Sequence, residues 1–160
     1  VAILDALSDY QKQYPTGRYR VRLTLANDGE VKTEAAILTE ANKKQVAFAK
    51  TPISADNRFL YHKTTNRSLY EAHQEAGLFD TLLWNEAGQV TEFTIGNVVL
   101  EIDGKLYTPP VSVGRLAGTF REKLLKEAKI TERVLYKEDF TKDRKVWLIN
   151  SVRQWVEVSF

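Results

Sequence analysis

Hydrophobic and polar residues follow two different periods in the first third of the chain. Residues 1–12 repeat their apolar positions every three or four residues, which predicts a short helix. Over residues 20–25 apolar and polar side chains alternate, and Asn27-Asp28-Gly29 then supplies residues that favour a left-handed turn. Residues 46–50 have the composition of another strand. The pattern therefore predicts a helix, a β-hairpin and a further strand.

Two helices are predicted in the remainder of the chain. The first starts at Ser68, which has the capping-box spacing to Glu71, and it ends at Gly77. The second begins near Gly118, with Thr119 as its N-cap and an apolar face that follows the helical period. Both helices are short, so the sequence predicts that strands provide most of the regular structure.

Short apolar segments that alternate with turn residues predict the remaining strands. Asp103-Gly104 favours a tight turn between two of these strands. The predicted strands are residues 81–84, 89–93, 95–102, 105–110, 133–136, 145–150 and 154–159. Strands and helices in this mixture predict an α+β fold that is dominated by a mixed sheet.

A proline-bearing loop, residues 51–57, is predicted to separate two packed units. This stretch, TPISADN, combines Pro52 with turn-forming residues and has no apolar period. We therefore predict a partial small domain over residues 1–50, an interdomain loop over residues 51–57 and a larger domain over residues 58–160.

Composition excludes several classes of function. The chain has 160 residues, of which 43% are hydrophobic and 28% charged, as expected for a globular protein without membrane spans. Basic residues exceed acidic ones by 23 − 21 = 2 and are interleaved with them, so a nucleic-acid partner is not predicted. The absence of cysteine excludes disulfides and thiol chemistry, and it favours a cytoplasmic location.

Metal and serine chemistry are also disfavoured by spacing. His62 and His73 are the only histidines and stand eleven positions apart, so no zinc-type cluster is predicted. Ser112 and Ser151 lack the glycine pattern of a nucleophile elbow. The glycine-rich phosphate loops of nucleotide-binding proteins are absent as well.

Three features remain as candidates for chemistry. Lys63 follows the apolar run 59–61, and burial at a strand end would favour a neutral, nucleophilic amine, although a surface lysine is the more frequent case. Glu92 lies in a strand and is either buried or a solvent-facing residue of the alternation. Gly118 and Thr119 open a helix, which is an anion site by geometry or simply a capped end.

Four sequence segments together carry a family resemblance. They are YHKTTNR (61–67), NEAGQVTEFTIGNVVLEIDGKLYTPP (85–110), GRLAGTFRE (114–122) and INSVRQW (149–155). Their order and the run Glu-x-Thr-x-x-Asn resemble the fold-type IV pyridoxal-phosphate enzymes. This family includes branched-chain and D-amino-acid aminotransferases and 4-amino-4-deoxychorismate lyase. The resemblance implies a large domain with a mixed pseudo-barrel sheet and flanking helices, plus the later half of a small α/β domain.

The resemblance assigns cofactor roles to several residues. By matching position, Lys63 would hold pyridoxal 5'-phosphate as an internal aldimine, and Glu92 would bond the pyridine nitrogen. Gly118 and Thr119 would receive the cofactor phosphate at the helix start. Ser151, with the amide of Val152, would supply a second phosphate contact.

Two further residues keep alternative interpretations. Asn97 falls in the family motif, where it either contacts the cofactor or only fixes the loop. Arg153 is a candidate for holding a substrate carboxylate, because its planar guanidinium group can bind a carboxylate bidentately. A surface salt bridge is the competing interpretation.

Within the family, the resemblance favours the lyase. LAGTFRE and NSVRQW are most similar to lyases, in particular those fused to the chorismate-aminating subunit of para-aminobenzoate synthesis. Aminotransferases usually carry a tyrosine a few residues after their lysine, where this chain has Asn66 and Arg67. The implied reaction converts 4-amino-4-deoxychorismate to 4-aminobenzoate and pyruvate through a quinonoid. The alternatives are an aminotransferase of the same fold and an inactive docking module.

The resemblance also carries expectations about the whole protein. The matched segments include only the later half of the small domain and the chain does not begin with methionine, so we expect residues to precede Val1 in the natural protein. We therefore expect weak cofactor affinity and little turnover from these 160 residues alone. The resemblance further implies a homodimer and a fusion to, or association with, a chorismate-aminating synthase domain.

Overall fold

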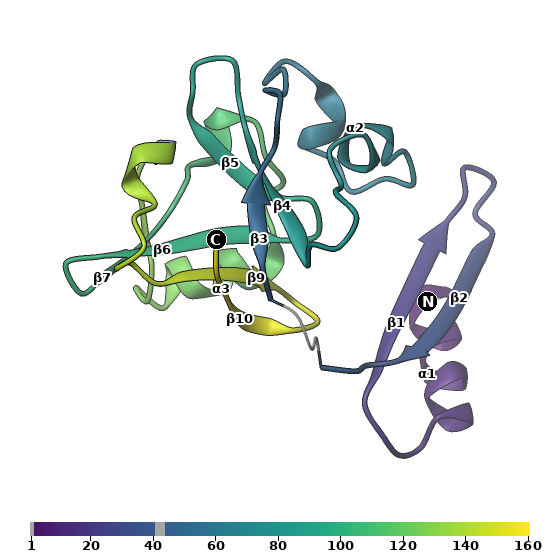
Figure 1. The fold of residues 1–160 in the computed structure, drawn as a ribbon. Coiled ribbons are helices and arrows are strands. Elements are labelled where there is room, and N and C mark those ends of the chain that lie inside the picture. Colours follow the sequence, from purple (N-terminus) through teal and green to yellow (C-terminus); the bar gives the residue numbers. More distant parts are fainter. Residues whose placement is uncertain (1, 41–43) are drawn as a thin grey trace. The chain divides into compact units, whose positions relative to one another are not determined.

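The computed structural model describes residues 2–40 and 44–160, and its contacts divide the chain into two compact units, Val1–Ala41 and Asn42–Phe160 (Figure 1). The first unit consists of α1 (Ala2–Gln13) and an antiparallel hairpin of β1 (Tyr19–Leu25) and β2 (Val31–Ile37). The predicted helix and hairpin are confirmed, apart from Val1, which lies outside the described residues. No described helix is both long enough and apolar enough to cross a bilayer.

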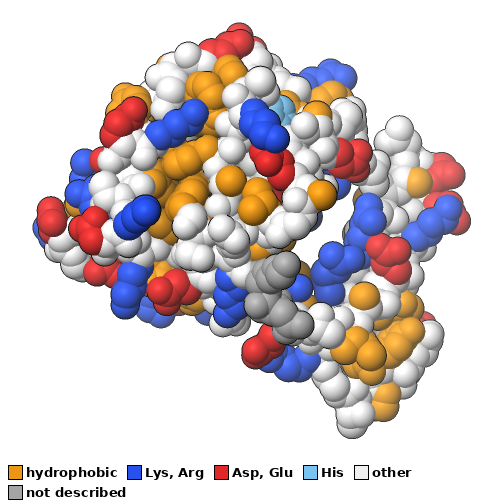
Figure 2. All heavy atoms as spheres, viewed as in Figure 1, with side chains coloured by type: hydrophobic (Ala, Val, Ile, Leu, Met, Phe, Trp, Pro, Cys, Tyr) orange, Lys and Arg blue, Asp and Glu red, His pale blue; other side chains and the backbone are white. Residues whose placement is uncertain are grey.

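The surface of the first unit carries a concentration of apolar side chains. Ile3, Leu4 and Leu7 of α1 are 38%, 70% and 38% exposed, and Ile37 of β2 is 72% exposed. Figure 2 shows hydrophobic side chains gathered on this unit around the position of α1. A two-stranded sheet with one helix offers too little area to bury these residues.

The second unit contains two sheets and most of the secondary structure. A three-stranded sheet has the order β3 (Val46–Phe48), β4 (Asp80–Trp84), β5 (Val90–Phe93). A five-stranded sheet has the order β10 (Gln154–Val158), β9 (Val146–Asn150), β6 (Asn97–Ile102), β7 (Lys105–Thr108), β8 (Thr131–Glu132). The β3–β4 and β7–β8 pairs are parallel and the others antiparallel, so the predicted mixed sheet is confirmed.

Strand β6 lies at the centre of the larger sheet and is buried on both faces. Val98 and Leu100 belong to the main core cluster, whereas Val99 packs in a second cluster with Leu124 of α3 (Thr119–Lys126). A strand between a core and a helix needs apolar residues in succession, which explains the run Val98 to Leu100. The turn after β6 has positive φ at Asp103 and Gly104, as the sequence predicts.

The domain boundary lies earlier than the sequence predicts. The division of the chain into units falls between residues 41 and 42, so residues 51–57 are a loop inside the second unit and residues 46–50 do not belong to the small domain. Strand β3 pairs with β4, and buried Ile53 donates its amide to Trp84 O at 2.8 Å. Proline and turn residues predict a loop correctly, but they carry no information about which unit the loop packs on.

Helix starts and one strand also differ from prediction. Helix α2 is the single turn Ser68–Glu71 with Arg67 as N-cap, so the predicted capping box and the helix to Gly77 are wrong. Ser68 Oγ instead donates to Asn66 Oδ1. Helix α3 has Gly118, not Thr119, as N-cap.

Residues 133–136 contribute a single bridge from Tyr136 rather than a strand. The described residues of this unit also form three short 3-10 helices, at Arg58–Leu60, Val111–Val113 and Lys137–Asp139.

Candidate functional site

Three loops at the ends of the central strands bring most of the predicted site residues together. Asn150, at the end of β9, donates from Nδ2 to Ile95 O at 3.1 Å, which joins the loop after β9 to the loop before β6. The hydroxyls of Thr119, which begins α3, and Ser151 are 2.6 Å apart. These contacts join segments that are 55 and 32 residues apart in sequence.

Glu92 is a buried carboxyl group with several donors around it. Its side chain, in β5, is only 3% exposed, so the interpretation as a solvent-facing strand residue is wrong. Tyr70 Oη donates to Glu92 Oε1 at 2.8 Å, and the Leu116 amide lies 3.3 Å from both carboxyl oxygens. Burial raises the pKa of Glu92 to about 7, against the lowering effect of the bonds from Tyr70 and Leu116.

Asn97 connects this carboxyl group to the start of α3. Its Nδ2 donates to Leu116 O at 3.0 Å and, at the longer distance of 3.4 Å, to Glu92 Oε2. A Cβ added at Gly118 would collide with Asn97 Oδ1, so this position needs glycine for close approach rather than for its φ of −67°. Of the two interpretations of Asn97, the one in which it fixes the loop is therefore realised by direct contacts.

The start of α3 and the loop after β9 form a polar edge. Thr119 and Ser151 are exposed, and the first turn of α3 presents backbone amides that have no partner within a helix. The amide of Val152, which was predicted to bind phosphate, instead donates to Asn150 Oδ1 at 3.1 Å, as does the amide of Arg153 at 2.8 Å. Two hydroxyls and a helix start are thus the groups able to receive an anion here.

Lys63 lies in an exposed loop rather than at the end of a buried strand. The apolar run before it forms a 3-10 turn in which Leu60 is buried, and the chain then emerges to the surface. The predicted desolvation of Lys63 is therefore wrong for the chain as it stands. Arg67, four residues later, donates from Nη2 to Thr94 O at 2.6 Å and so ties the loop to the segment after Glu92.

Two residues around Glu92 were not identified from the sequence. Tyr70 is 8% exposed and Arg115 fully buried. Arg115 donates from Nε to Pro109 O at 2.8 Å and from Nη1 to Leu116 O at 3.0 Å, so it braces the loop whose amide reaches Glu92. Burial, followed by the charge of Arg121, lowers the pKa of Arg115 to about 9. Only the motif GRLAGTF carried a signal for Arg115, and nothing local marked Tyr70.

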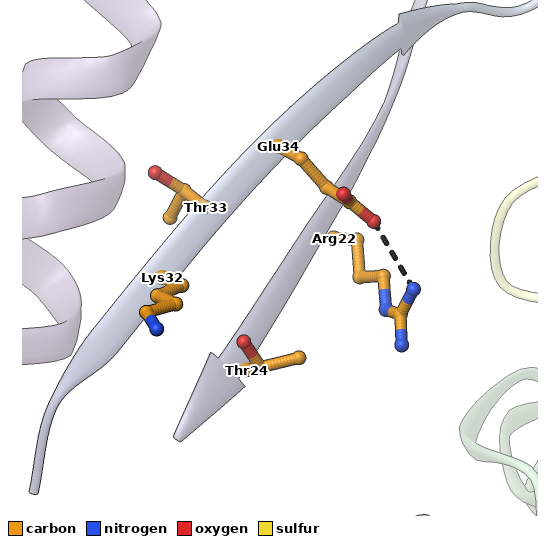
Figure 3. A pocket seen from close by; sticks show the side chains of 5 residues that line it. All are labelled: Arg22, Thr24, Lys32, Thr33 and Glu34. Carbon is orange, nitrogen blue, oxygen red and sulfur yellow. Dashed lines mark hydrogen bonds and ion pairs between the residues drawn. The ribbon is translucent and has the colours of Figure 1, made fainter. Parts of the chain in front are cut away.

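A shallow hollow of the surface lies apart from these residues. It is on the hairpin of the first unit and is lined by Arg22, Thr24, Lys32, Thr33 and Glu34 (Figure 3). Arg22 and Glu34 form an ion pair across the strands, 3.2 Å apart and largely exposed. None of the residues predicted from the sequence lines this hollow, and its charged groups are partnered on an open face. The buried carboxyl group of Glu92 and the start of α3 are therefore stronger candidates for a functional site than this concavity.

Comparisons with known proteins agree on one family. The family model described as amino-transferase class IV matches residues 2–159. A curated protein of Schizosaccharomyces pombe, provisionally named aminodeoxychorismate lyase, is 34% identical over 151 residues, covering 87% of this chain. This chain spans 65% of the length of that relative.

Two solved structures show the same architecture. A protein of Mesorhizobium loti, provisionally named amino-acid aminotransferase, superposes with a TM-score of 0.86 at 31% identity, over 98% of this chain and 79% of that one. A protein of Legionella pneumophila, provisionally named 4-amino-4-deoxychorismate lyase, gives 0.72 at 24% identity, over 80% of this chain and 52% of that one. The second likeness concerns the fold alone.

Proposed function

Because the chain belongs to the class IV aminotransferase family, we propose that it acts with pyridoxal 5'-phosphate as a 4-amino-4-deoxychorismate lyase. Family membership and the fold-type IV architecture confirm the resemblance drawn from the sequence, and enzymes of this family depend on pyridoxal phosphate. The observation that carries the cofactor assignment is the buried Glu92, which is held by Tyr70 and Leu116 beside the loop that leads to α3.

The residues present fit this cofactor. Buried Glu92 suits the ring nitrogen, because a carboxyl group whose pKa is near 7 can share a proton with a pyridine. The Thr119 and Ser151 hydroxyls, with the start of α3, suit a phosphate dianion. Lys63 offers an exposed primary amine for the aldehyde. When bound, the cofactor supplies an electron sink for negative charge on the substrate carbon.

The side chains of this chain would then carry out the following steps. Lys63 would hold the cofactor covalently through its side-chain amine. Once free of that bond, the same amine would remove the proton from the amine-bearing carbon of 4-amino-4-deoxychorismate. Elimination of the enolpyruvyl group then yields 4-aminobenzoate and pyruvate, and these two products account for all the atoms of the substrate. Arg153 is proposed to hold a substrate carboxylate.

Two observations favour the lyase over the aminotransferase. The S. pombe relative with a lyase name matches 87% of this chain at 34% identity. Aminotransferases usually have a tyrosine a few residues after their lysine, whereas the loop after Lys63 has Arg67. The Arg67 guanidinium donates to Thr94 O and lies 4.8 Å from the centroid of the Tyr70 ring. The M. loti aminotransferase, at 31% identity over 98% of the chain, makes transamination the second candidate function.

A pair of product assays tests the proposal. Given 4-amino-4-deoxychorismate and saturating cofactor, the chain should release 4-aminobenzoate and pyruvate slowly but in equal amounts, and Lys63→Ala should abolish both products. Given 2-oxoglutarate with branched-chain or D-amino acids, it should form no glutamate. Glutamate formation without 4-aminobenzoate would replace the lyase by an aminotransferase, and neither product at saturating cofactor would contradict both candidate functions for this chain.

The wider biological setting also belongs to the proposal. A place in folate biosynthesis, a cytoplasmic location, homodimerisation and fusion to a chorismate-aminating synthase domain follow from the lyase assignment and stay predictions. Size-exclusion chromatography with light scattering tests the dimer directly, because a homodimer of this 18.3 kDa chain doubles the measured mass.

A further inference from the structure

The two oxygens of the Glu92 carboxyl group have different surroundings. Oε1 receives the 2.8 Å bond from Tyr70 Oη. Oε2 receives a 3.4 Å contact from Asn97 Nδ2, and the Leu116 amide is shared at 3.3 Å with each oxygen. Distances beyond about 3.2 Å describe weak N–H···O bonds. Oε2 therefore keeps the greater capacity to accept a further strong donor.

We propose that Tyr70 is a positioning residue, which fixes Glu92 through Oε1 so that Oε2 bonds the ring nitrogen of the cofactor. The inference rests on the proposed pyridoxal-phosphate function and assigns a task to a residue outside the family motifs found in the sequence. Tyr70 does not itself touch the cofactor in this assignment. It acts by holding the one carboxyl group that does.

The surroundings of Tyr70 suit a permanent donor. Burial, followed by the charge and hydrogen bond of Glu92, raises the pKa of the Tyr70 phenol far above its ordinary value, so the hydroxyl keeps its proton at every practical pH. The Arg67 guanidinium packs over the ring and is itself fixed to Thr94 O at 2.6 Å. Ring and hydroxyl are thus held in one place.

The direction of the Tyr70 bond also matters for the proton between Glu92 and the cofactor. Burial favours the neutral form of Glu92, whereas a hydroxyl donor favours the ionised form. An ionised Glu92 stabilises a protonated ring nitrogen, which is the form that withdraws electrons. Removing the Tyr70 hydroxyl would therefore weaken cofactor binding only where the cofactor has a ring nitrogen.

A cofactor analogue separates this role from a structural one. Affinities of the wild-type chain and Tyr70→Phe are measured by fluorescence titration with pyridoxal phosphate and with 1-deazapyridoxal phosphate, whose ring nitrogen is replaced by carbon. Loss of a hydrogen bond to a charged group predicts that Tyr70→Phe binds pyridoxal phosphate about tenfold more weakly. The two proteins should bind the deaza analogue equally. Tyr107→Phe, a partly buried tyrosine of the same unit, serves as control and should match wild type.

Each remaining outcome has a definite meaning. If Tyr70→Phe lost the same affinity for both cofactors, Tyr70 would have only a structural role. If it lost affinity for neither, Tyr70 would have no role in cofactor binding. Both results would overturn the inference. A wild-type chain that binds neither cofactor would instead contradict the proposed function and the inference with it. In the background of Glu92→Gln, the Tyr70→Phe change should no longer affect pyridoxal-phosphate affinity.

A second variant covers the case in which Tyr70→Phe does not fold. Replacing Tyr70 by 3-fluorotyrosine keeps the ring and the hydroxyl but makes the phenol a stronger donor. The pH midpoint of pyridoxal-phosphate binding should then fall, because the ionised form of Glu92 is stabilised. Binding of the deaza analogue should keep its midpoint. An unchanged midpoint for pyridoxal phosphate would overturn the inference.

Discussion

At the scale of single residues, Glu92 combines burial with one strong hydrogen bond from Tyr70 and weaker contacts from Leu116 and Asn97. A carboxyl group that is 3% exposed would be costly without partners, and here a phenol and a backbone amide lie within 3.3 Å of it. Burial nevertheless dominates, because the pKa of Glu92 is raised from 4.5 to about 7. The folded chain thus holds a proton at Glu92 that the unfolded chain releases.

This proton makes the folding stability depend on pH. Between pH 4.5 and 7 the folded state binds more protons at Glu92 than the unfolded state, so stability falls as the pH rises through this range. The contribution is fully present below pH 4.5 and lost above pH 7, and it amounts to about 3 kcal/mol. Glu92→Gln, neutral in both states, should lack this loss in urea unfolding at pH 5 and pH 8.

A control separates the effect of Glu92 from general titration. Glu157→Gln removes an exposed glutamate of β10 and should keep the pH profile of the wild-type chain. If Glu92→Gln and wild type lost the same stability between pH 5 and pH 8, Glu92 would not carry a raised pKa in the folded chain.

The sequence predicts the site residues that lie in motifs, but it does not predict the residues that contact them. Glu92, Asn97, Gly118, Thr119 and Ser151 stand in segments whose spacing marks them, and the structure brings these segments together. The burial of Glu92 could not be read from the sequence, because a two-residue alternation fits an exposed or a covered strand equally well. The contact between Tyr70 and Glu92 spans 22 residues and leaves no local pattern.

At the scale of elements, α3 is anchored by two buried arginines that share one acid. Arg121 of α3 and Arg115 before it are 4% and 0% exposed, and both face Glu132 of β8. Arg121 also donates to Pro109 O at 3.0 Å. These contacts therefore fix α3 to β8, the edge strand of the larger sheet, and with it the helix start where the phosphate is proposed to bind.

Neutralising the shared acid should loosen this anchor. Glu132→Gln leaves two buried guanidinium groups with a weaker acceptor, and we expect it to lower the free energy of unfolding by about 1–2 kcal/mol. Urea denaturation measures the change. Glu122→Gln, which removes an exposed partner of Lys126 on the same helix, is the matched control and should have no measurable effect. Equal effects of the two variants would show that the arginines do not depend on Glu132.

Element prediction succeeded where the cause of structure is local. The Asn27-Asp28-Gly29 and Asp103-Gly104 turns and the alternation around them predicted both hairpins, because turn residues and side-chain alternation act within a few positions. It failed at residues 72–77, where helix-forming residues continue but the chain turns away after Glu71. The amide of Phe79 bonds Gln45 O at 2.7 Å, a contact with a distant segment that no local period records.

At the scale of the whole molecule, the two units differ in their cores. Among the described residues, the buried hydrophobic side chains all lie between Val46 and Val158, in the second unit. The first unit has a two-stranded sheet and one helix with largely exposed apolar residues. The domain boundary was misplaced for the same reason, since packing rather than composition decides which unit a loop joins.

This difference predicts unequal protection of backbone amides. Amides of β1 and β2 should exchange with solvent orders of magnitude faster than those of β6 and β9, because opening a small unit without a core costs little free energy. Hydrogen exchange followed by mass spectrometry on the full chain resolves the two regions. Comparable protection of both regions would mean that the first unit is stabilised in a way that its own contacts do not explain.

We propose that this chain binds pyridoxal phosphate through Lys63, with Glu92 at the ring nitrogen. The most direct measurement adds saturating cofactor, reduces with borohydride and maps the modified peptide by mass spectrometry. We predict modification confined to Lys63, absent in Lys63→Ala and diminished in Glu92→Gln. Labelling scattered over surface lysines, or a Lys63 that stays unmodified at saturating cofactor, would contradict this cofactor site.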